Sequence, residues 1–496
     1  MDYAQFPDPV YRDTVLKPLF DGAKHYHADA FRAIDRAHLV MLAESGILDA
    51  EIAKKLAEAL AAIDEEIDPQ TLEYTGEVED YFFAREKALK ARLGVDTGGR
   101  LHTARSRNDI DHTVFKLALK ARIDALLADL RALLAALIAK AEAEKATLVM
   151  AYTHGQPAQP TTFGHYLAAL IEILLRDMAR LESARETVNL CSMGAAAITT
   201  SGFAIDRARV AELLGFAAPQ ENSYGCIAAV DYVTATYSAI ELVFLHLGRF
   251  IQDLQFHTAF EVGQIHVPDA FVQISSIMPQ KRNPVPIEHL RHLASQTVAR
   301  ARMMRDIVHN TPFTDMNDSE GETQETGYQT FASAHRVLRL LASLVPALQI
   351  NEKRVRGHMD NACVTITELA DELVRREDLS FRAAHEIAAV VAKAVVAREE
   401  SLSQGGFAPF RQAFQEVVGR ETAIDADTFA HIVSPEHFVA VRERFGGPGK
   451  KALGEALCRY RTELDLRARR AEVIRKKEDN AALALAQAFH QLTETR

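Results

Sequence analysis

Apolar residues recur at every third or fourth position along most of the chain, which is the spacing of one face of an α-helix. The clearest run covers about 109–145 and contains neither glycine nor proline. Four more long runs cover about 162–188, about 230–260, the segment that follows Pro286, and about 322–348. Helices of this length exceed the usual length in globular proteins and need equally long partners. The pattern therefore predicts an all-α protein with a central bundle of five extra-long helices.

Shorter helical patterns flank this bundle. Residues 28–66 hold two amphipathic segments, which Gly46 interrupts and which restart near Asp49, a residue type that caps helices. Loops near Asn108 and near Asp360 separate helices of different spacing. We therefore expect three helical domains: an N-terminal domain at 1–108, a bundle that forms the oligomerisation and catalytic core at 109–359, and a C-terminal domain with an extended tail at 360–496.

The tail, DLRARRAEVIRKKEDNAALALAQAFHQLTETR, is basic at first and then rich in alanine and leucine. Such a segment is either an added interaction helix or a helix with a solvated face and a docking stripe. The pattern favours the second interpretation, because mixed charges around a narrow apolar stripe are typical of a helix that packs on its own protein.

Composition excludes several classes of protein. The 496 residues are 48% hydrophobic and 25% charged, without tryptophan, which is ordinary for a helical protein in solution. Its apolar runs are too short to span a bilayer, and the start shows no secretory signal. A net charge of −11 argues against a nucleic-acid partner. We expect a cytoplasmic protein that acts without membrane or nucleic acid.

Cofactor and metal motifs are missing as well. The four cysteines (Cys191, Cys226, Cys363 and Cys458) are scattered and form no CxxC pair, so they indicate reduced thiols and neither a disulfide frame nor a zinc site. The glycine pairs match neither a Walker loop nor a dinucleotide fingerprint. We expect no metal and no cofactor.

A first polar loop, GGRLHTARSRND at 98–109, directly precedes the longest helix. Ser106, Arg107 and Asn108 offer a hydroxyl, a forked cation and an amide beside a helix N-terminus. This combination suits a carboxylate or a phosphate, because the unpaired N–H groups and the helix dipole add to the arginine. The alternative is a helix cap, at Asn108 or Asp109, with solvated arginines.

A second polar loop, AYTHGQPAQPTTFGH at 151–165, carries Thr153 and His154. A histidine is suited to proton transfer near neutral pH. A lone loop histidine is more often a surface or capping residue, so the functional interpretation needs a partner. Glu288, near the start of a later helix, is the candidate that would orient it.

A third polar loop, QISSIMPQKRNP at 273–284, is interrupted by prolines and carries two adjacent serines. Ser275 would accept a proton if its pKa were strongly lowered, and Lys281 is a cation that would lower it or stabilise an oxyanion. Asn283 adds an amide to the same loop. A Gly-x-Ser-x-Gly elbow is absent from the sequence, which disfavours a covalent acyl-serine mechanism.

These loops carry a family resemblance. SSIMPQKRNP resembles the signature loop of the fumarase/aspartase superfamily, and HTARSRND resembles its argininosuccinate lyase branch. THGQPAQPTTFGHY, AELLGF with ENS, and ELADELVRR with SFRAAHEI extend the similarity over about 28–450. The resemblance implies an all-α homotetramer with a twenty-helix core, to which each chain gives five long helices. It also implies that loops from three different subunits meet in each active site.

The resemblance assigns roles to individual residues. Ser275 matches the general base that takes a proton from the carbon next to a carboxylate, and Lys281 and Asn283 match the groups that stabilise the resulting dianion. His154 matches a proton-handling residue, with Glu288 as its acidic partner. Matches to substrate-binding positions are Ser106, Arg107, Asn108 and Thr153. The implied reaction is elimination of an amine or guanidine from an N-substituted aspartate to give fumarate, with arginine as the leaving group in arginine biosynthesis.

The sequence departs from the branch where the leaving group is bound. In TDMNDSEGET (314–323), Asp315 stands where a tyrosine is expected, Glu320 where a glutamine is expected, and Thr323 where a lysine is expected. Near the N-terminus, Phe31 and Asp35 align with residues that contact the arginine moiety, and Val230 aligns with an arginine. Ile274 and Val285 replace an expected glycine and aspartate at the third loop.

These departures predict a more acidic pocket, with Asp315, Glu320 and also Asp35, that has lost a lysine suited to a carboxylate. We therefore expect the small-molecule substrate, an N-substituted aspartate, to release a cationic amine such as a diamine, and keep argininosuccinate as the other candidate. A catalytically silent structural homologue is a third hypothesis, although Ser275, Lys281 and His154 are all present.

Overall fold

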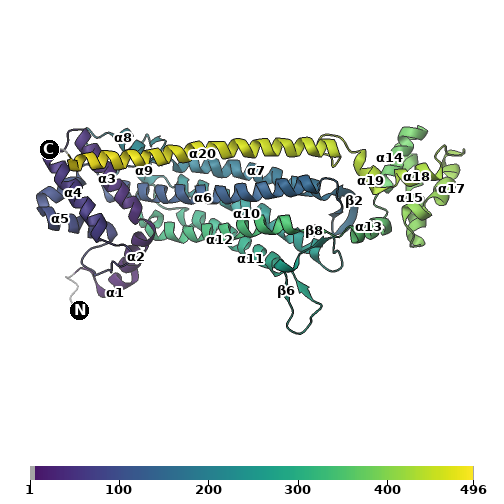
Figure 1. Ribbon diagram of the computed structural model, residues 1–496, viewed down its shortest axis with the longest axis horizontal. Coiled ribbons are helices and arrows are strands. Elements are labelled where there is room, and N and C mark those ends of the chain that lie inside the picture. Colours follow the sequence, from purple (N-terminus) through teal and green to yellow (C-terminus); the bar gives the residue numbers. More distant parts are fainter. Residues whose placement is uncertain (1–5, 495–496) are drawn as a thin grey trace.

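The computed structural model describes residues 6–494, and five long helices form its centre (Figure 1). They are α6 (Arg107–Ala143), α7 (Phe163–Val188), α10 (Asp231–Thr258), α11 (Val285–Val308) and α12 (Gly321–Ala347). Packing runs in a ring from α6 to α7, α10, α11, α12 and back to α6. The predicted all-α fold and its five extra-long helices are confirmed, each within about three residues of the expected bounds.

Helix α6 is the central member of the bundle. Ser106 caps its N-terminus, and the side chain of Asp109 accepts from the Ser106 backbone N–H at 2.8 Å, which completes a capping box. Its 37 residues include neither glycine nor proline. At about 1.5 Å per residue, the helix is roughly 55 Å long. The loops that precede and follow this helix are therefore separated by most of the length of the bundle.

Helices at the N-terminal end pack on the bundle and share its core. They are α1 (Pro9–Tyr11), the π-helical turn η1 (Arg12–Leu16), α2 (Lys17–Tyr26), α3 (Ala28–Glu44), α4 (Ala50–Glu66), α5 (Tyr81–Gly99) and the 3-10 turn η2 (Arg100–His102). The two helices expected at 28–66 are present, and Asp49 caps the second by accepting from the backbone N–H of Ile52 at 2.8 Å. Short elements of the middle of the chain are α8 (Arg207–Leu213), α9 (Ser223–Ala228), η3 (Asp269–Phe271) and η4 (Asn317–Ser319).

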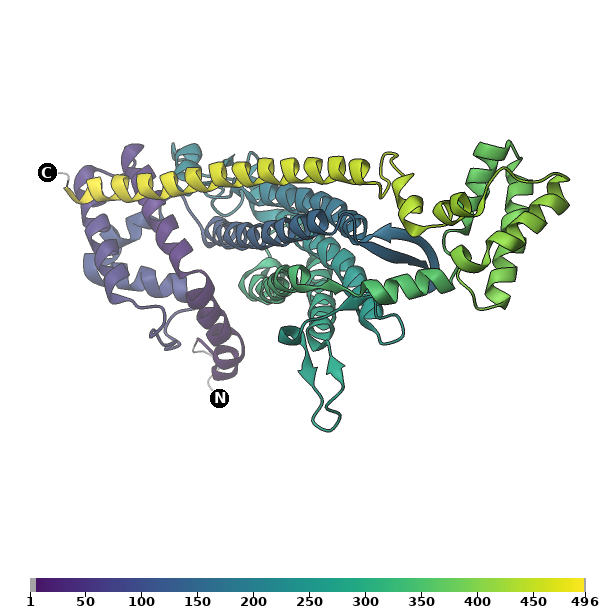
Figure 2. The same ribbon diagram turned by 45° about the vertical axis from the view of Figure 1, so that its right-hand side comes forward.

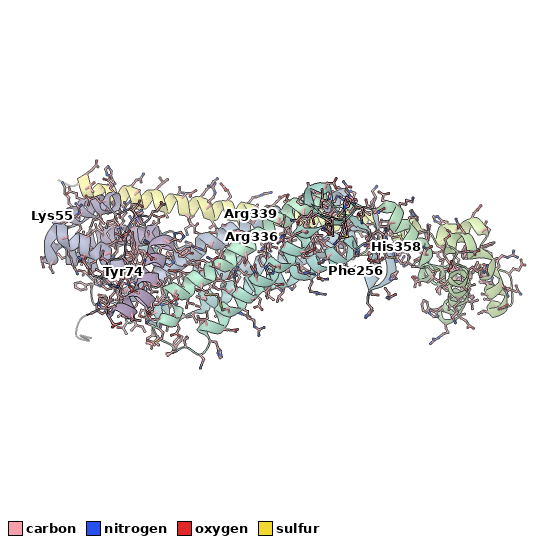
Figure 3. The ribbon with its side chains drawn as sticks, turned by 90° about the horizontal axis from the view of Figure 1, so that it is seen from below. Lys55, Tyr74, Phe256, Arg336, Arg339 and His358 are labelled. Carbon is pink, nitrogen blue, oxygen red and sulfur yellow. The ribbon has the colours of Figure 1, made fainter. Side chains whose placement is uncertain are left out.

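A separate apolar core holds the helices at the other end of the molecule. They are α14 (Ile366–Glu377), α15 (Phe381–Ala397), α16 (Leu402–Gly405), α17 (Phe407–Val418) and α18 (Ala426–Ile432), with α13 (Glu352–Asn361) and α19 (Pro435–Ala440) leading to and from them. In Figure 3, Lys55 and Tyr74 lie near the N-terminal end, and Phe256 and His358 lie where the bundle leads to these helices, which extend beyond them.

The last helix, α20 (Lys450–Glu494), returns along the whole bundle to the N-terminal helices, as Figures 1 and 2 show. It packs on α3, α4, α6, α7 and α8. A narrow stripe of apolar side chains along it is buried: Leu453, Leu457, Leu464, Leu485 and Phe489. The tail is thus a docked helix with a solvated face. The three-domain division stays a prediction, and residues 450–494 pack with the first two of those regions and not with the α14–α18 core.

Short strands interrupt the helical fold at four places. β1 (Leu148–Thr153) and β2 (Gln156–Thr162) form an antiparallel hairpin, and β6 (Gln273–Ile274) and β7 (Arg282–Asn283) form a second one. The remaining pairs are β3 (Leu190–Cys191) with β4 (Ala218–Pro219), and β5 (Ile265–His266) with β8 (Gln349–Ile350). Residues 151–165, expected as an irregular loop, therefore belong mostly to the first hairpin, because β-branched and aromatic residues at its base support a short strand. Among residues 6–494, the helices include none apolar and long enough to cross a membrane.

The docking of α20 makes a testable prediction. Leu485→Ala removes a side chain that is 7% exposed, while Leu483→Ala, two positions away, removes one that is 61% exposed. We expect the first substitution to lower the free energy of unfolding by about 2–3 kcal/mol, because it leaves a cavity between α20 and the N-terminal helices α3 and α4. The second should change it by less than about 0.5 kcal/mol. Denaturant unfolding of both variants measures this, and equal losses would contradict the packing.

Candidate active site

The residues expected at the active site lie in three separate patches. The first patch, at the start of α6, holds Ser106, Arg107 and Asn108 together with Asp315 and Glu320. The second patch is the tip of the β1–β2 hairpin, with Thr153 and His154. The third patch is the β6–β7 hairpin and the first turn of α11, with Ser275, Lys281, Asn283 and Glu288. One chain thus brings together the first group but not all three.

The start of α6 is fixed by a buried carboxylate. Asp109 accepts from the backbone N–H groups of Gly194 at 2.8 Å and Ala196 at 3.0 Å, and burial raises the pKa of Asp109 to about 6. The Asn108 amide donates to the Ala197 carbonyl at 3.0 Å. The cap expected at Asn108 or Asp109 is therefore Ser106, and the adjacent loop at 194–197 is held against the helix start.

Arg107 is only partly used by the protein. Its Nη2 atom contacts Asp111 at 2.7 Å and Asp80 at 2.9 Å, while its guanidinium lies 5.1 Å from the centre of the Phe82 ring. Its Nη1 atom is buried and has no hydrogen-bond partner among residues 6–494. An arginine with one nitrogen in ion pairs and a second nitrogen unpaired is suited to a bound carboxylate. The solvated-arginine alternative does not apply to Arg107.

Carboxylates crowd this arginine. Burial raises the pKa of Asp111 to about 8; Arg107 opposes the rise, and the charges of Asp80, Glu320 and Asp315 add to it. Burial and Asp315 also raise the pKa of Glu320. Asp80, Asp111 and Glu320 therefore act on one guanidinium, and Asp315 adds a fourth carboxylate to the cluster. Such an environment favours a positively charged ligand.

A histidine completes the first patch. His112 is 1% exposed, and its Nδ1 atom lies 3.1 Å from the Tyr232 hydroxyl. Its Nε2 atom lies 3.7 Å from Oδ1 of Asp315, too far for a hydrogen bond. Within the described part of the chain, neither of these two atoms has a hydrogen-bond partner. Burial lowers the pKa of His112, so the ring is neutral near pH 7.

Sequence reasoning missed four members of this patch and misplaced one. Asp80, Asp111, His112 and Tyr232 were not expected, although Asp111 lies one helical turn after Arg107 and was the one detectable signal. Asp35 was expected in the acidic pocket and does not belong there. Its carboxylate is buried in ion pairs with Arg105 at 2.8 Å and Arg85 at 3.2 Å, which neutralise it.

The second patch is a sharp turn. His154 and Gly155 join β1 to β2 with φ values of 55° and 72°, the left-handed geometry of a two-residue hairpin turn. Thr153 and His154 are exposed at the tip. Among residues 6–494, no hydrogen bond or ion pair joins His154 to Glu288, the residue expected to orient it. The pairing of His154 with Glu288 therefore stays a prediction.

The third patch projects from the bundle, as Figure 2 shows for the β6–β7 hairpin. The Ser275 hydroxyl oxygen accepts from the backbone N–H of Met278 at 3.1 Å, and the Asn283 amide donates to the Gln273 carbonyl at 3.2 Å. A donor to the serine oxygen favours its anionic form. The neighbouring Ile274 and Ile277 are 80% and 83% exposed. A small hairpin with such apolar side chains in solvent is suited to a covering partner.

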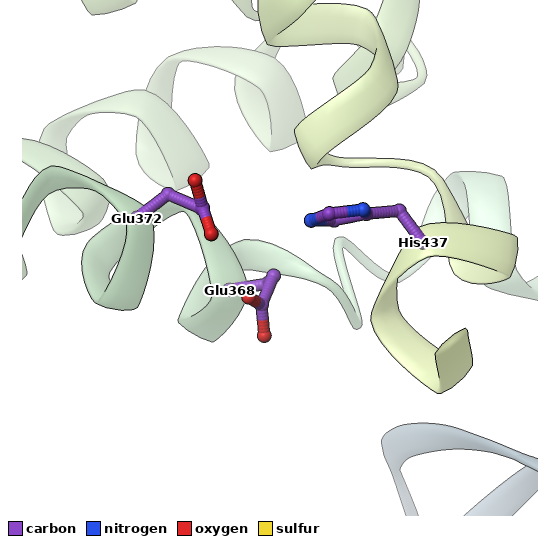
Figure 4. Close-up of side chains that lie close together, drawn as sticks. All are labelled: Glu368, Glu372 and His437. Carbon is purple, nitrogen blue, oxygen red and sulfur yellow. The ribbon is translucent and has the colours of Figure 1, made fainter. Parts of the chain in front are cut away.

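A different cluster resembles a metal site but is already neutralised. Glu368 and Glu372 on α14 face His437 of α19 (Figure 4). Arg442 donates to Glu368 at 2.6 Å, and Arg375 donates to Glu372 at 2.9 Å. Further pairs join Arg375 to Glu368 and Arg376 to Glu372. Arginines occupy the carboxylate oxygens, so this cluster is an ion-pair network that ties α14 to the segment after α19.

Comparisons with known proteins agree with this architecture. A lyase family model matches residues 26–299, and a model of the argininosuccinate lyase C-terminal region matches residues 363–440. A solved EDDS lyase variant with bound fumarate has a TM-score of 0.85 and 26% identity over 99% of this chain and 97% of its own. The comparisons thus assign the chain to the carbon–nitrogen lyases of the fumarate-releasing class.

Sequence relatives narrow the class. Argininosuccinate lyase 2 of Agrobacterium fabrum is 67% identical over 497 residues, which cover 100% of this chain and 98% of the relative. Argininosuccinate lyase of Nitrosococcus oceani is 35% identical over 86% of this chain and 90% of its own length. The chain belongs to the argininosuccinate lyase branch of the fumarase/aspartase superfamily.

The crowded carboxylates predict a pH-dependent stability. The pKa of Asp111 is raised from 3.8 to about 8, so between these values the folded protein holds a proton that the unfolded chain has lost. Stability therefore falls as the pH rises through this window. Asp111→Asn has no proton to lose, and we expect it to be more stable than the parent by about 1–3 kcal/mol at pH 8, with a smaller difference near pH 4.

Thermal unfolding between pH 4 and pH 9 measures this difference. Glu322→Gln, which removes an exposed carboxylate in the first turn of α12, is the matched control and should follow the parent curve. Parallel curves for Asp111→Asn and the parent would contradict the shifted pKa.

Proposed function

We propose that this fumarate-releasing lyase acts on an N-substituted aspartate whose leaving amine carries a positive charge. The observation that supports the proposal is the first patch, where Asp315 and Glu320 join two further carboxylates around Arg107. Thr323 stands in the same segment where the resemblance leads one to expect a lysine. A pocket rich in carboxylates and without that lysine favours a cation and disfavours a carboxylate on the leaving group.

Ser275 is the base in this proposal. It removes a proton from the carbon next to a carboxylate of the substrate, and Lys281 and Asn283 stabilise the dianion that forms. A proton at such a carbon is barely acidic, so fixed cations and donors around the carboxylate provide most of the rate. The backbone donor from Met278 and the position of Lys281 on the same hairpin support this assignment.

Other residues bind the substrate and complete the elimination. Arg107 binds a substrate carboxylate through its unpaired Nη1 atom, with Ser106 and Asn108 beside it at the helix start. His154, oriented by Glu288, protonates the departing nitrogen, because an amine leaves readily only when it is protonated. Thr153 lies next to His154 at the hairpin tip and contacts the substrate there.

The distances within one chain support a homotetramer with shared active sites. Arg107 starts α6, and His154 lies beyond its far end, so roughly 55 Å of helix separates them within one chain. Residues that must act on one small substrate therefore come from different copies. Closed symmetry lets the same three patches meet several times in one assembly.

The proposed enzyme is cytoplasmic and works on a small molecule. All four cysteines are free thiols in the structure, and Cys191, Cys226 and Cys363 are buried. Free thiols are typical of a reducing compartment. The net charge of −11 supports a partner other than nucleic acid.

Complementation between inactive variants tests the shared site. Ser275→Ala and His154→Asn should each lower turnover by about 100-fold or more, because each removes a proton-transfer group. Co-assembled from both chains, the enzyme should regain a measurable share of activity, since some sites then receive an intact Ser275 from one copy and an intact His154 from another. Fumarate absorbance measures the turnover.

Two controls make this result interpretable. Ser403→Ala, on an exposed position of α16, should keep full activity. A chain that carries both Ser275→Ala and His154→Asn should restore less activity, when co-assembled with either single variant, than the two single variants restore together. Absence of recovery in the mixed assembly would place the site within one chain, and unchanged turnover in both single variants would overturn the roles of Ser275 and His154. Absence of fumarate release by the parent protein itself, with every substrate offered, would favour a silent structural protein.

Argininosuccinate is the second candidate substrate, because the Agrobacterium fabrum relative at 67% identity bears the name of that activity. Feeding the purified enzyme argininosuccinate and N-aminoalkyl aspartates, while recording fumarate absorbance, separates the two. We expect the aminoalkyl substrates to be turned over at least about tenfold more efficiently, a difference of about 1.4 kcal/mol in the transition state. Faster turnover of argininosuccinate would overturn the altered-pocket proposal.

A further inference from the structure

The β1–β2 hairpin, which carries His154 at its tip, is incompletely packed at its base. It leaves the end of the bundle beside α13, as Figure 1 shows. A cavity of about 360 Å³ lies under the hairpin, between its two strands and the helices α7 and α10. Apolar contacts alone therefore do not fix this side of the hairpin, and polar contacts contribute to its position.

Gln264, in the segment after α10, binds the backbone of β1. Its side-chain Oε1 atom accepts from the backbone N–H of Met150 at 3.1 Å, and its Nε2 atom donates to the Met150 carbonyl at 3.2 Å. Pro160 is the residue opposite Met150 in the hairpin, and a proline has no N–H to donate. The Gln264 amide thus offers Met150 a donor and an acceptor, as a neighbouring strand does.

A chain of hydrogen bonds leads from Gln264 into the bundle. Its Nε2 atom lies 2.7 Å from Nδ1 of His257, and Nε2 of His257 lies 3.2 Å from Oδ2 of Asp253. The Tyr166 hydroxyl donates to the same Asp253 oxygen at 2.7 Å. The end of α10 and the first turn of α7 are thereby connected to β1 through one network.

The contacts also fix the orientation of each group in the network. Because Oε1 of Gln264 accepts from Met150, its Nε2 end faces His257, so Nδ1 of His257 accepts and Nε2 carries the ring proton. That proton is donated to Asp253. Burial alone would raise the pKa of Asp253, but hydrogen bonds from His257 and Tyr166 lower it below its ordinary value. The carboxylate is therefore charged and a strong acceptor.

The network lies within a single chain, whereas the hairpin tip is exposed. Met150, His257 and Gln264 are each at most 5% exposed, so they leave no surface for another copy of the chain. His154 lies in solvent four residues beyond Met150, which is roughly 13 Å of extended strand. A tilt of β1 at Met150 therefore moves the imidazole of His154.

We propose that Gln264 and His257 are positioning residues for the reaction, which set the direction of β1 and so place His154 where it protonates the departing nitrogen. This inference rests on the proposed function, which gives His154 that role. Gln264 and His257 act through the strand and do not touch the substrate. Proton transfer needs a short distance between heavy atoms, and a displacement of about 1 Å is enough to slow turnover by about 100-fold.

A double-mutant cycle tests the positioning role. Gln264→Ala removes both contacts with Met150, and we expect it to lower kcat by about 10-fold or more in the parent enzyme. In the His154→Asn background, where the acid is already absent, the same substitution should lower kcat by less than about threefold, because residues that act as one unit have non-additive effects. Fumarate absorbance measures kcat, with argininosuccinate and with N-(2-aminoethyl)aspartate as substrates.

Two variants of His257 provide an independent test, also if Gln264→Ala does not fold. His257→Asn keeps an oxygen that accepts from Gln264, whereas His257→Leu has no acceptor, and both lose the contact with Asp253. We expect kcat of the first to stay within about threefold of the parent and kcat of the second to fall by about 10-fold. Gln412→Ala, on an exposed position of α17, is the control and should keep full activity.

The outcomes distinguish this inference from the proposed function. Full turnover by His154→Asn, or no fumarate from the parent enzyme with either substrate, would overturn the proposed function. If His154→Asn is impaired as expected, unchanged kcat in Gln264→Ala would overturn the positioning role alone. Equal losses from Gln264→Ala in both backgrounds, or equal losses in the two His257 variants, would overturn it as well.

Discussion

The uninterrupted helix α6 is the constraint on which the remaining structure depends. Because its 37 residues are capped by Ser106 and contain no breaker, it acts as a rod that holds Arg107 at one end of the bundle and the β1–β2 hairpin at the other. The ring of helices around it and the returning α20 bury its apolar surface. A chain built on such a rod holds these two functional loops far apart. In the proposed function, this separation is the reason why the active site needs residues from more than one copy of the chain.

Carboxylates at the start of α6 lower the stability of the folded protein in a way that a binding function explains. A protein under selection for stability alone would not bury Asp111 next to Asp80 and Glu320, because their mutual repulsion raises the free energy of the folded state. Asp109, by comparison, receives three backbone N–H groups and anchors a loop. Within one helical turn, Asp109 is thus a structural carboxylate, and Asp111 is a carboxylate without sufficient positive partners. Places where local rules are broken in this way are where function is expected.

Periodicity was sufficient to predict the helices because each long helix buries a continuous stripe, and the stripe repeats in the sequence. The two hairpins left weaker signals. β1 has six residues, too few for alternation to stand out against the loop chemistry of His154 and Gly155. The site was predicted to the extent that its residues share a motif. Asp80 pairs with Arg107, and Tyr232 with His112, from other elements, so only the packing of those elements reveals them.

Charge on its own was an unreliable guide to the pocket, and Asp35 shows why. From the sequence, Asp35 and Asp315 are equivalent carboxylates near a binding site. In the structure, Arg85 and Arg105 neutralise Asp35 within the N-terminal helices, whereas Asp315 meets a neutral histidine and further carboxylates. A binding carboxylate therefore differs from a structural one because it lacks a pairing partner within the chain. Whether a partner is present depends on the three-dimensional neighbours of the carboxylate.

Exposed apolar residues on the β6–β7 hairpin extend the same reasoning from charge to surface. Ile274 and Ile277 lie in solvent beside Ser275, although a hairpin this short has little packing of its own. A partner that covers these side chains would stabilise the hairpin and at the same time exclude water from the serine. The same contact would then serve assembly and catalysis. Lys281 stabilises the substrate dianion more strongly where water is excluded. The single chain thus leaves apolar side chains of the β6–β7 hairpin uncovered, just as it leaves carboxylates at the start of α6 unpaired.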